Sequence, residues 1–189
     1  MKMRTSVQLS LILTAAIAAF TSGCGTVSKM QPATSASGGS LKLKKYSRVV
    51  VLTPTTSITD AKAKPVAEKA CGYFADTMVD NLRKRKVAET IERDGATNDA
   101  LVISTVITRC TEGSASLRLW IGMGAGSSYF DATVSFMDGT SGEAVGTLVV
   151  DKNSWALGGG AAAAQTITAF MDAAAEKVAE QVQLAMSGN

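Results

Sequence analysis

Apolar and polar residues alternate along two segments in the second half of the chain. The in-phase positions of the first are Leu101, Ile103, Thr105 and Ile107; those of the second are Phe130, Ala132, Val134 and Phe136. A period of two places such side chains on one face of a strand, so residues 100–109 and 129–137 are predicted to be half-buried β-strands. Residues 117–121 form a short apolar stretch between them. Residues 144–150 are predicted to pair with the second strand across the loop Asp138–Glu143.

Two other segments show a helical period, residues 61–86 and 161–186. Their apolar stripes are Val66, Ala70, Phe74, Met78 and Leu82 in the first, and Ile167, Phe170, Met171, Ala174, Val178, Val182 and Met186 in the second. Short apolar runs at 47–53 and 86–91 flank the first helix. This order predicts an α+β fold: a single two-layer domain over residues 46–189, with two long helices on one face of a mostly antiparallel sheet.

The first 23 residues have the pattern of a signal peptide. Lys2 and Arg4 precede an apolar run over residues 7–20. A membrane-spanning helix needs about 20 apolar residues, and this run is shorter. Residues 1–23 are therefore predicted to direct export and to be removed.

The residues that follow, Ser22-Gly23-Cys24, resemble a bacterial lipobox. That resemblance implies acylation of Cys24 with chains such as palmitate, and several chains give stable membrane binding where a single chain does not. Gly25 stands where an aspartate would favour the inner membrane, which implies anchoring to the outer membrane, facing the periplasm of a bacterial envelope. The alternative is ordinary signal cleavage, which leaves Cys24 as an odd thiol.

Residues 24–45 are predicted to be a lipidated, flexible tether. Residues 25–40 are rich in Gly, Ser, Thr and Ala and show no apolar periodicity. A tether of that length would hold the folded domain clear of the lipid headgroups.

Composition narrows the function. The 189 residues contain no histidine, which removes His-based catalysis and His metal sites. A net charge of +3 and 5% aromatic residues argue against nucleic acid as a partner. We therefore expect no metal, no cofactor and no enzymatic activity.

The cysteine count suggests a disulfide. With Cys24 acylated, Cys71 and Cys110 remain as a pair in an oxidising compartment, so a disulfide between them is predicted. The alternative is two separate buried thiols, which behave as small apolar side chains.

One glycine-rich segment is a candidate for contact with a partner. Its residues are Arg118, Trp120, Gly122, Gly124 and Gly126. Arg and Trp are enriched at interface hot spots, and glycines allow close approach of a backbone. The glycine spacing is wrong for a phosphate loop, so the other interpretation is a connection between strands with positive φ angles.

Asp76 and Asp80 could form a carboxylate pair, but Asp80 with Lys84 is better interpreted as a solvated ion pair on a helix.

The segment from Arg118 to Ser128, followed by Asp138-Gly139-Thr140-Ser141-Gly142-Glu143, resembles the bacterial family catalogued as domain of unknown function 4410. The resemblance covers residues 48–182 and implies an exported lipoprotein without an assigned activity. The favoured hypothesis is an envelope lipoprotein that binds other, unidentified envelope proteins. A carboxylate-based hydrolase of envelope glycans and a carrier of lipids or small ligands are the alternatives.

Overall fold

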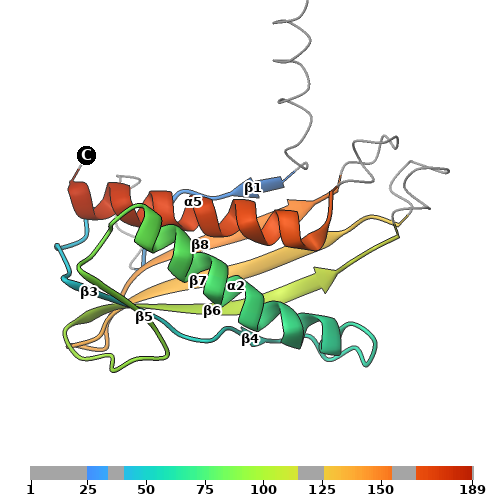
Figure 1. Cartoon of the computed structure of the whole chain (residues 1–189), viewed down its shortest axis with the longest axis horizontal. Coiled ribbons are helices and arrows are strands. Elements are labelled where there is room, and N and C mark those ends of the chain that lie inside the picture. The colour runs from blue at the N-terminus through green and yellow to red at the C-terminus, as the bar shows by residue number, and fades with distance from the viewer. Residues whose placement is uncertain (1–24, 34–40, 115–125, 155–164, 189) are drawn as a thin grey trace, which may run out of the picture.

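The structure has two layers, a β-sheet and a pair of helices that cover one of its faces (Figure 1). It is a computed structural model that describes residues 25–33, 41–114, 126–154 and 165–188. Helices α2 (Lys64–Lys84) and α5 (Ile167–Ser187) lie side by side on the sheet. The α+β fold predicted from the sequence is confirmed.

The sheet is mixed and, within the described residues, has eight strands. The main path runs β1-β8-β7-β6-β3-β5, while β2 pairs with β8 and β4 pairs with β6. The strands are β1 (Gly25–Val27), β2 (Gln31–Pro32), β3 (Arg48–Val51), β4 (Thr55–Thr56), β5 (Thr90–Arg93), β6 (Ala100–Thr111), β7 (Tyr129–Asp138) and β8 (Ala144–Asn153). Strands β6, β7 and β8 are antiparallel, whereas β3 is parallel to both β5 and β6.

Helix α2 connects the parallel strands β3 and β5. Pro65 stands in its first turn, where its missing N–H leaves no hydrogen bond unmade. The carboxylate of Asp60 accepts hydrogen bonds from the N–H groups of Lys62 and Ala63 in the turn just before the helix. Arg83 and Lys84 lie in the last turn, where cations favour the negative end of the helix dipole.

Aromatic and aliphatic side chains fill the space between sheet and helices. Phe74 of α2 packs on Phe130 of β7, with ring centroids 5.0 Å apart. Phe136, Met78 and Leu148 are also fully buried there. The alternation predicted for β7 is confirmed, because Phe130, Ala132, Val134 and Phe136 all face this core.

Asp138 closes the hairpin between β7 and β8. Its Oδ1 accepts hydrogen bonds from the N–H groups of Thr140 and Ser141, and its Oδ2 accepts one from the Tyr46 hydroxyl at 2.9 Å and contacts Lys44. The Lys44 ammonium, followed by the turn N–H groups, holds the pKa of Asp138 well below its usual range. Burial, and then the carboxylate, raises the pKa of Tyr46.

The N-terminal segment is not the flexible tether that its composition predicts. Strands β1 and β2 both pair antiparallel with β8, and Met30 between them is 5% exposed. Leu43 and Tyr46 are buried as well. The prediction of flexibility is therefore wrong for residues 25–32, because hydrogen bonding to a distant strand orders a segment that has no apolar period of its own. Leu43 is held differently, since its N–H donates to the carbonyl of Ala185 on α5 at 2.9 Å.

The predicted signal peptide, residues 1–23, lies outside the described residues. Among the helices that are described, none combines the length and the apolar character needed to cross a bilayer.

Candidate functional site

The sheet has one face that the helices leave uncovered. We call its central part the open face, and it consists of Ser104, Val106, Thr133, Ser135, Thr147 and Val149. These residues form two rows across β6, β7 and β8, Val106–Thr133–Val149 and Ser104–Ser135–Thr147. Val149 is 51% exposed and Val106 is 37% exposed. The open face is thus uncharged, small in side-chain size and apolar at its two most exposed positions.

A charged group borders the open face where β6 ends and β7 begins. Arg109 stands opposite Asp131, and Asp131 stands opposite Asp151. The Arg109 guanidinium carbon lies 3.4 Å from the centre of the Tyr129 ring, a cation–π contact. Burial, then the charge of Asp151, raises the pKa of Asp131, while Arg109 opposes the rise.

The raised pKa of Asp131 is a property that acid–base catalysis uses. One oxygen of Asp131, Oδ1, is buried with no hydrogen-bond partner in the described part of the chain. Glycoside hydrolysis, however, needs two carboxylates flanking a bound sugar. These two stand side by side on adjacent strands, and the surface hollows described below are lined by other residues.

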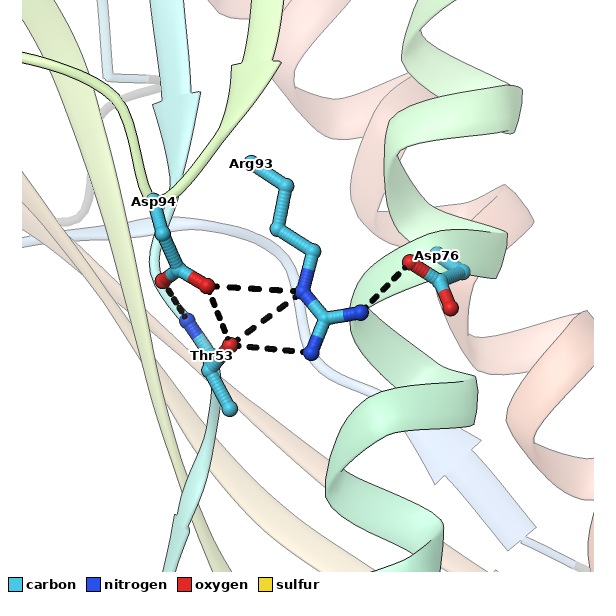
Figure 2. Close-up of polar contacts among 4 residues, drawn as sticks. All are labelled: Thr53, Asp76, Arg93 and Asp94. Carbon is cyan, nitrogen blue, oxygen red and sulfur yellow. Dashed lines mark hydrogen bonds and ion pairs between the residues drawn. The ribbon is translucent and has the colours of Figure 1, made fainter.

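A second polar cluster links β3, β5 and α2 (Figure 2). Arg93 contacts Asp76 of the helix at 2.7 Å and the hydroxyl of Thr53 at 3.0 Å. Thr53 in turn donates to Asp94 from its N–H at 2.6 Å and from its hydroxyl at 2.5 Å. These contacts, led by the Thr53 hydroxyl, lower the pKa of Asp94.

This cluster follows the carboxyl ends of two parallel strands, where open α/β sheets often bind ligands. Here all three guanidinium nitrogens of Arg93 contact protein oxygens. The cluster therefore acts as a clamp between strands and helix rather than as an anion site. Its carboxylates are exposed, so its contribution to stability is small.

Asp76 and Asp80 do not form a site together. Asp76 belongs to the Arg93 clamp, whereas Asp80 lines a hollow of about 600 Å³ between α2 and α5 with Lys84, Asp172 and Glu176. A second hollow, of about 580 Å³, lies near Tyr46, Lys86 and Glu89. Within the residues that the structure describes, no group of three or more Cys, Asp or Glu side chains is placed to hold a metal ion.

Most of the predicted contact segment lies outside the described residues, namely Arg118, Trp120, Gly122 and Gly124. Gly126 is described and has a φ of +70°. Its carbonyl accepts a hydrogen bond from the N–H of Ser114 at 2.8 Å. This bond joins the residues that follow β6 to the residues that precede β7. For Gly126, the interpretation as a strand connection with positive φ is confirmed.

Cys24, the predicted site of acylation, also lies outside the described residues. Cys71 and Cys110 are described, and both are buried free thiols, so the predicted disulfide is not present and the alternative of two thiols describes the structure. Burial first, then the neighbouring Cys71 and Glu112, raises the pKa of Cys110 to about 11. Burial also raises the pKa of Cys71, which disfavours the thiolate that disulfide exchange requires.

Sequence analysis did not identify the open face or the Asp131–Asp151 pair. The outward positions of β7 follow from its alternation, but the outward partners on β6 and β8 follow only from strand register. Asp131 and Asp151 both occupy outward positions of neighbouring strands. Their presence there is the sequence feature that could have indicated a carboxylate pair.

The fold and the sequence together define the class of protein. The two-layer domain, with a mixed sheet covered by two helices on one face, includes the hairpin at residues 138–143, part of the pattern that suggested a family. The chain belongs to the family described as a domain of unknown function, DUF4410, whose model matches residues 45–159. No curated protein matches the sequence.

Solved structures share this fold at low sequence identity. A PelC dodecamer from Paraburkholderia phytofirmans is 15% identical, with a TM-score of 0.56, and the match covers 84% of this chain and 97% of that one. A protein of the DUF330 family from Xanthomonas campestris is 9% identical, with a TM-score of 0.53, and the match covers 83% and 95%. Both establish similarity of fold.

Proposed function

We propose that this chain is a bacterial envelope protein, anchored through acyl chains on Cys24, that binds other proteins through the open face of its sheet. The observation that carries this proposal is the exposure of Val106 and Val149 among four other uncharged side chains, with the charged residues of this side of the sheet at the border of the open face. Interface centres are depleted in charge. The helical layer already covers the opposite face, so the open face is the side of the sheet that has room for a partner.

The first partner to test is a second copy of the same chain. Copies anchored in one membrane meet at high local concentration, and one of the similar structures is a PelC dodecamer. Ser22-Gly23-Cys24 and the following Gly25 favour anchoring to the outer membrane, on its periplasmic side. We infer no enzymatic role, since the family has no assigned activity and the clamp and the hairpin cluster are built from ion pairs within the protein.

The experiment begins with the mature protein purified from membranes in detergent. Its intact mass should show acyl chains on Cys24, and light scattering with crosslinking should show assemblies larger than a monomer. Val149→Lys should reduce these assemblies because it buries a charge at the centre of the interface. Leu184→Lys is the matched control, since Leu184 is 43% exposed on α5 in the helical layer. Equal assembly of both variants would contradict a role for the open face.

A hydrolase remains the second candidate because burial and Asp151 raise the pKa of Asp131. This hypothesis predicts that the purified protein releases fragments from peptidoglycan and that Asp131→Asn abolishes the release. Failure of the unmodified protein to cleave peptidoglycan would remove this candidate. A lipid carrier has no such support, because fully buried side chains such as Phe74 and Leu148 fill the space between sheet and helices.

A further inference from the structure

The segment that follows Cys24 runs along the outer edge of β8. Gly25 stands opposite Lys152, and Val27 stands opposite Val150. Beyond β1, the N–H of Ser28 donates to the carbonyl of Val149 at 2.9 Å, and the Ser28 hydroxyl accepts from the Val149 N–H at 2.9 Å. Strand β2 then pairs with β8 at residues 146–147. The segment therefore completes the sheet.

Side chains hold this segment against the core as well. The Met30 side chain is 5% exposed, and its N–H donates to Oε1 of Gln181 on α5 at 3.2 Å. Gly146 of β8 allows this close approach, because a Cβ there would lie 2.6 Å from the Leu41 side chain and 3.2 Å from the carbonyl oxygen of Gln31. Residues 25–32 are thus fixed to the domain along their whole length.

The segment begins at one particular end of the sheet. Gly25 pairs with β8 beside Asn153, the last residue of that strand. Asn153 stands opposite Tyr129 at the start of β7, and Tyr129 stands opposite Thr111 at the end of β6. We call Gly25, Asn153, Tyr129 and Thr111 the anchor end. The hairpin after Asp138 and the C-terminus of α5 lie at the other end of the molecule (Figure 1).

We propose that the anchor end rests directly on the membrane surface, so that the domain stands on the bilayer in one fixed orientation. This inference depends on the acylation of Cys24 proposed above. Only one peptide unit separates Cys24 from β1, and successive Cα atoms are about 3.8 Å apart. Acyl chains on Cys24 must enter the hydrocarbon, so the first residues of β1 are held at the level of the lipid headgroups.

The orientation has a consequence for partners. Strands β6, β7 and β8 run from the anchor end to the opposite end of the domain, so they stand away from the membrane and the open face looks sideways along it. In this orientation, the open faces of neighbouring anchored copies can contact one another laterally. The competing orientation places the opposite end, where Lys45, Lys84 and Lys86 lie, on anionic lipid.

The test measures which end of the anchored protein lies near lipid. The mature protein is reconstituted in phosphatidylcholine and phosphatidylglycerol vesicles that contain lipids brominated near the headgroup. An environment-sensitive fluorophore is attached at Glu112→Cys, beside the anchor end, or at Ser141→Cys, in the β7–β8 hairpin. Both positions are exposed, while the native Cys71 and Cys110 are buried. Unsubstituted protein treated with the fluorophore controls for labelling of those thiols.

We expect brominated lipid to quench the label at position 112 and to leave the label at position 141 bright. A Gly/Ser insert of about 20 residues after Cys24, beginning with Gly, spans on the order of 25 Å and should abolish this difference. Equal quenching without the insert, or stronger quenching at position 141, would overturn the proposal. The intact mass, taken before reconstitution, separates the proposed function from the proposed orientation. A mature chain without acyl groups contradicts both proposals. An acylated chain with the wrong quenching pattern contradicts only the orientation.

Discussion

The two faces of the sheet differ in their side chains and in how far those side chains are buried. On the covered face, Phe130 and Phe136 are fully buried beneath the two helices, and Phe74 of α2 packs on Phe130. On the open face, Val106 and Val149 are exposed among threonines and serines. Burial of apolar area stabilises a fold in proportion to the area removed from water. The difference teaches that this domain obtains its stability from one face of the sheet, whereas the other face leaves apolar side chains in contact with water.

The largest effect should follow from breaking the covered face. Phe74→Ala removes a ring that is fully buried against Phe130 and leaves a cavity, so it should lower the free energy of unfolding by about 3–5 kcal/mol. Urea denaturation followed by circular dichroism measures the change. Tyr73→Ala on the same helix is the control, since Tyr73 is 40% exposed, and its cost should be about 1 kcal/mol or less. Similar costs for the two variants would refute the contrast.

A gain in stability is expected where the covered face contains an unpaired hydroxyl. Oγ1 of Thr105 is buried and has no hydrogen-bond partner in the described part of the chain. Thr105→Val keeps the shape and removes this polar atom, so it should raise the free energy of unfolding by about 1 kcal/mol. Thr133→Val on the open face should change it little. A loss of stability in Thr105→Val would show that the hydroxyl is satisfied.

The charged group beside the open face should give the protein a measurable pH dependence. The pKa of Asp131 is raised in the folded chain, so the folded state binds this proton more tightly than the unfolded state does. Stability should therefore fall as pH rises from the usual aspartate range through the raised pKa. Asp151→Asn removes the like charge and should make this fall shallower. Thermal unfolding across that pH range measures it, and an unchanged slope would mean that Asp151 does not act on Asp131.

The smallest effect is expected from a single substitution made on the open face. Val149→Thr should alter the free energy of unfolding by less than about 0.5 kcal/mol, because the added hydroxyl stays in water. The same exchange at Val134, fully buried on the covered face of the neighbouring strand, should cost about 1–3 kcal/mol because the hydroxyl loses its water. If the two exchanges cost the same, the two faces do not differ as described.

The elements that carry their own apolar period could be predicted from the sequence. The alternation in β7 and the stripes of α2 and α5 place Phe130, Phe74 and Phe170 in the core, where the structure has them. The strand predicted at residues 86–91 forms instead at Thr90–Arg93. Lys86 has a φ of +52° and turns the chain, and Val87 is buried without belonging to a strand.

The elements that depend on a distant partner could not be predicted. Strands β1 and β2 contain three and two residues, and their hydrogen bonds go to β8. Strand β8 itself extends to Asn153, beyond its predicted end at residue 150, where β1 pairs with it. The open face and the Asp131–Asp151 pair have the same origin, because each brings together residues from different strands through register. Local sequence does not encode such register.

The pairing of β1 with β8 also sets an order of events during folding. The first described strand of the chain docks on one of the last, so this contact closes a very long loop, which is entropically costly until the strands between them are in place. We therefore expect β8 to form first against β7, which leaves unpaired backbone groups on its outer edge until β1 and β2 dock. Residues 25–32 end the exposure, so the segment that follows Cys24 should also protect the newly folded sheet from strand exchange with its neighbours.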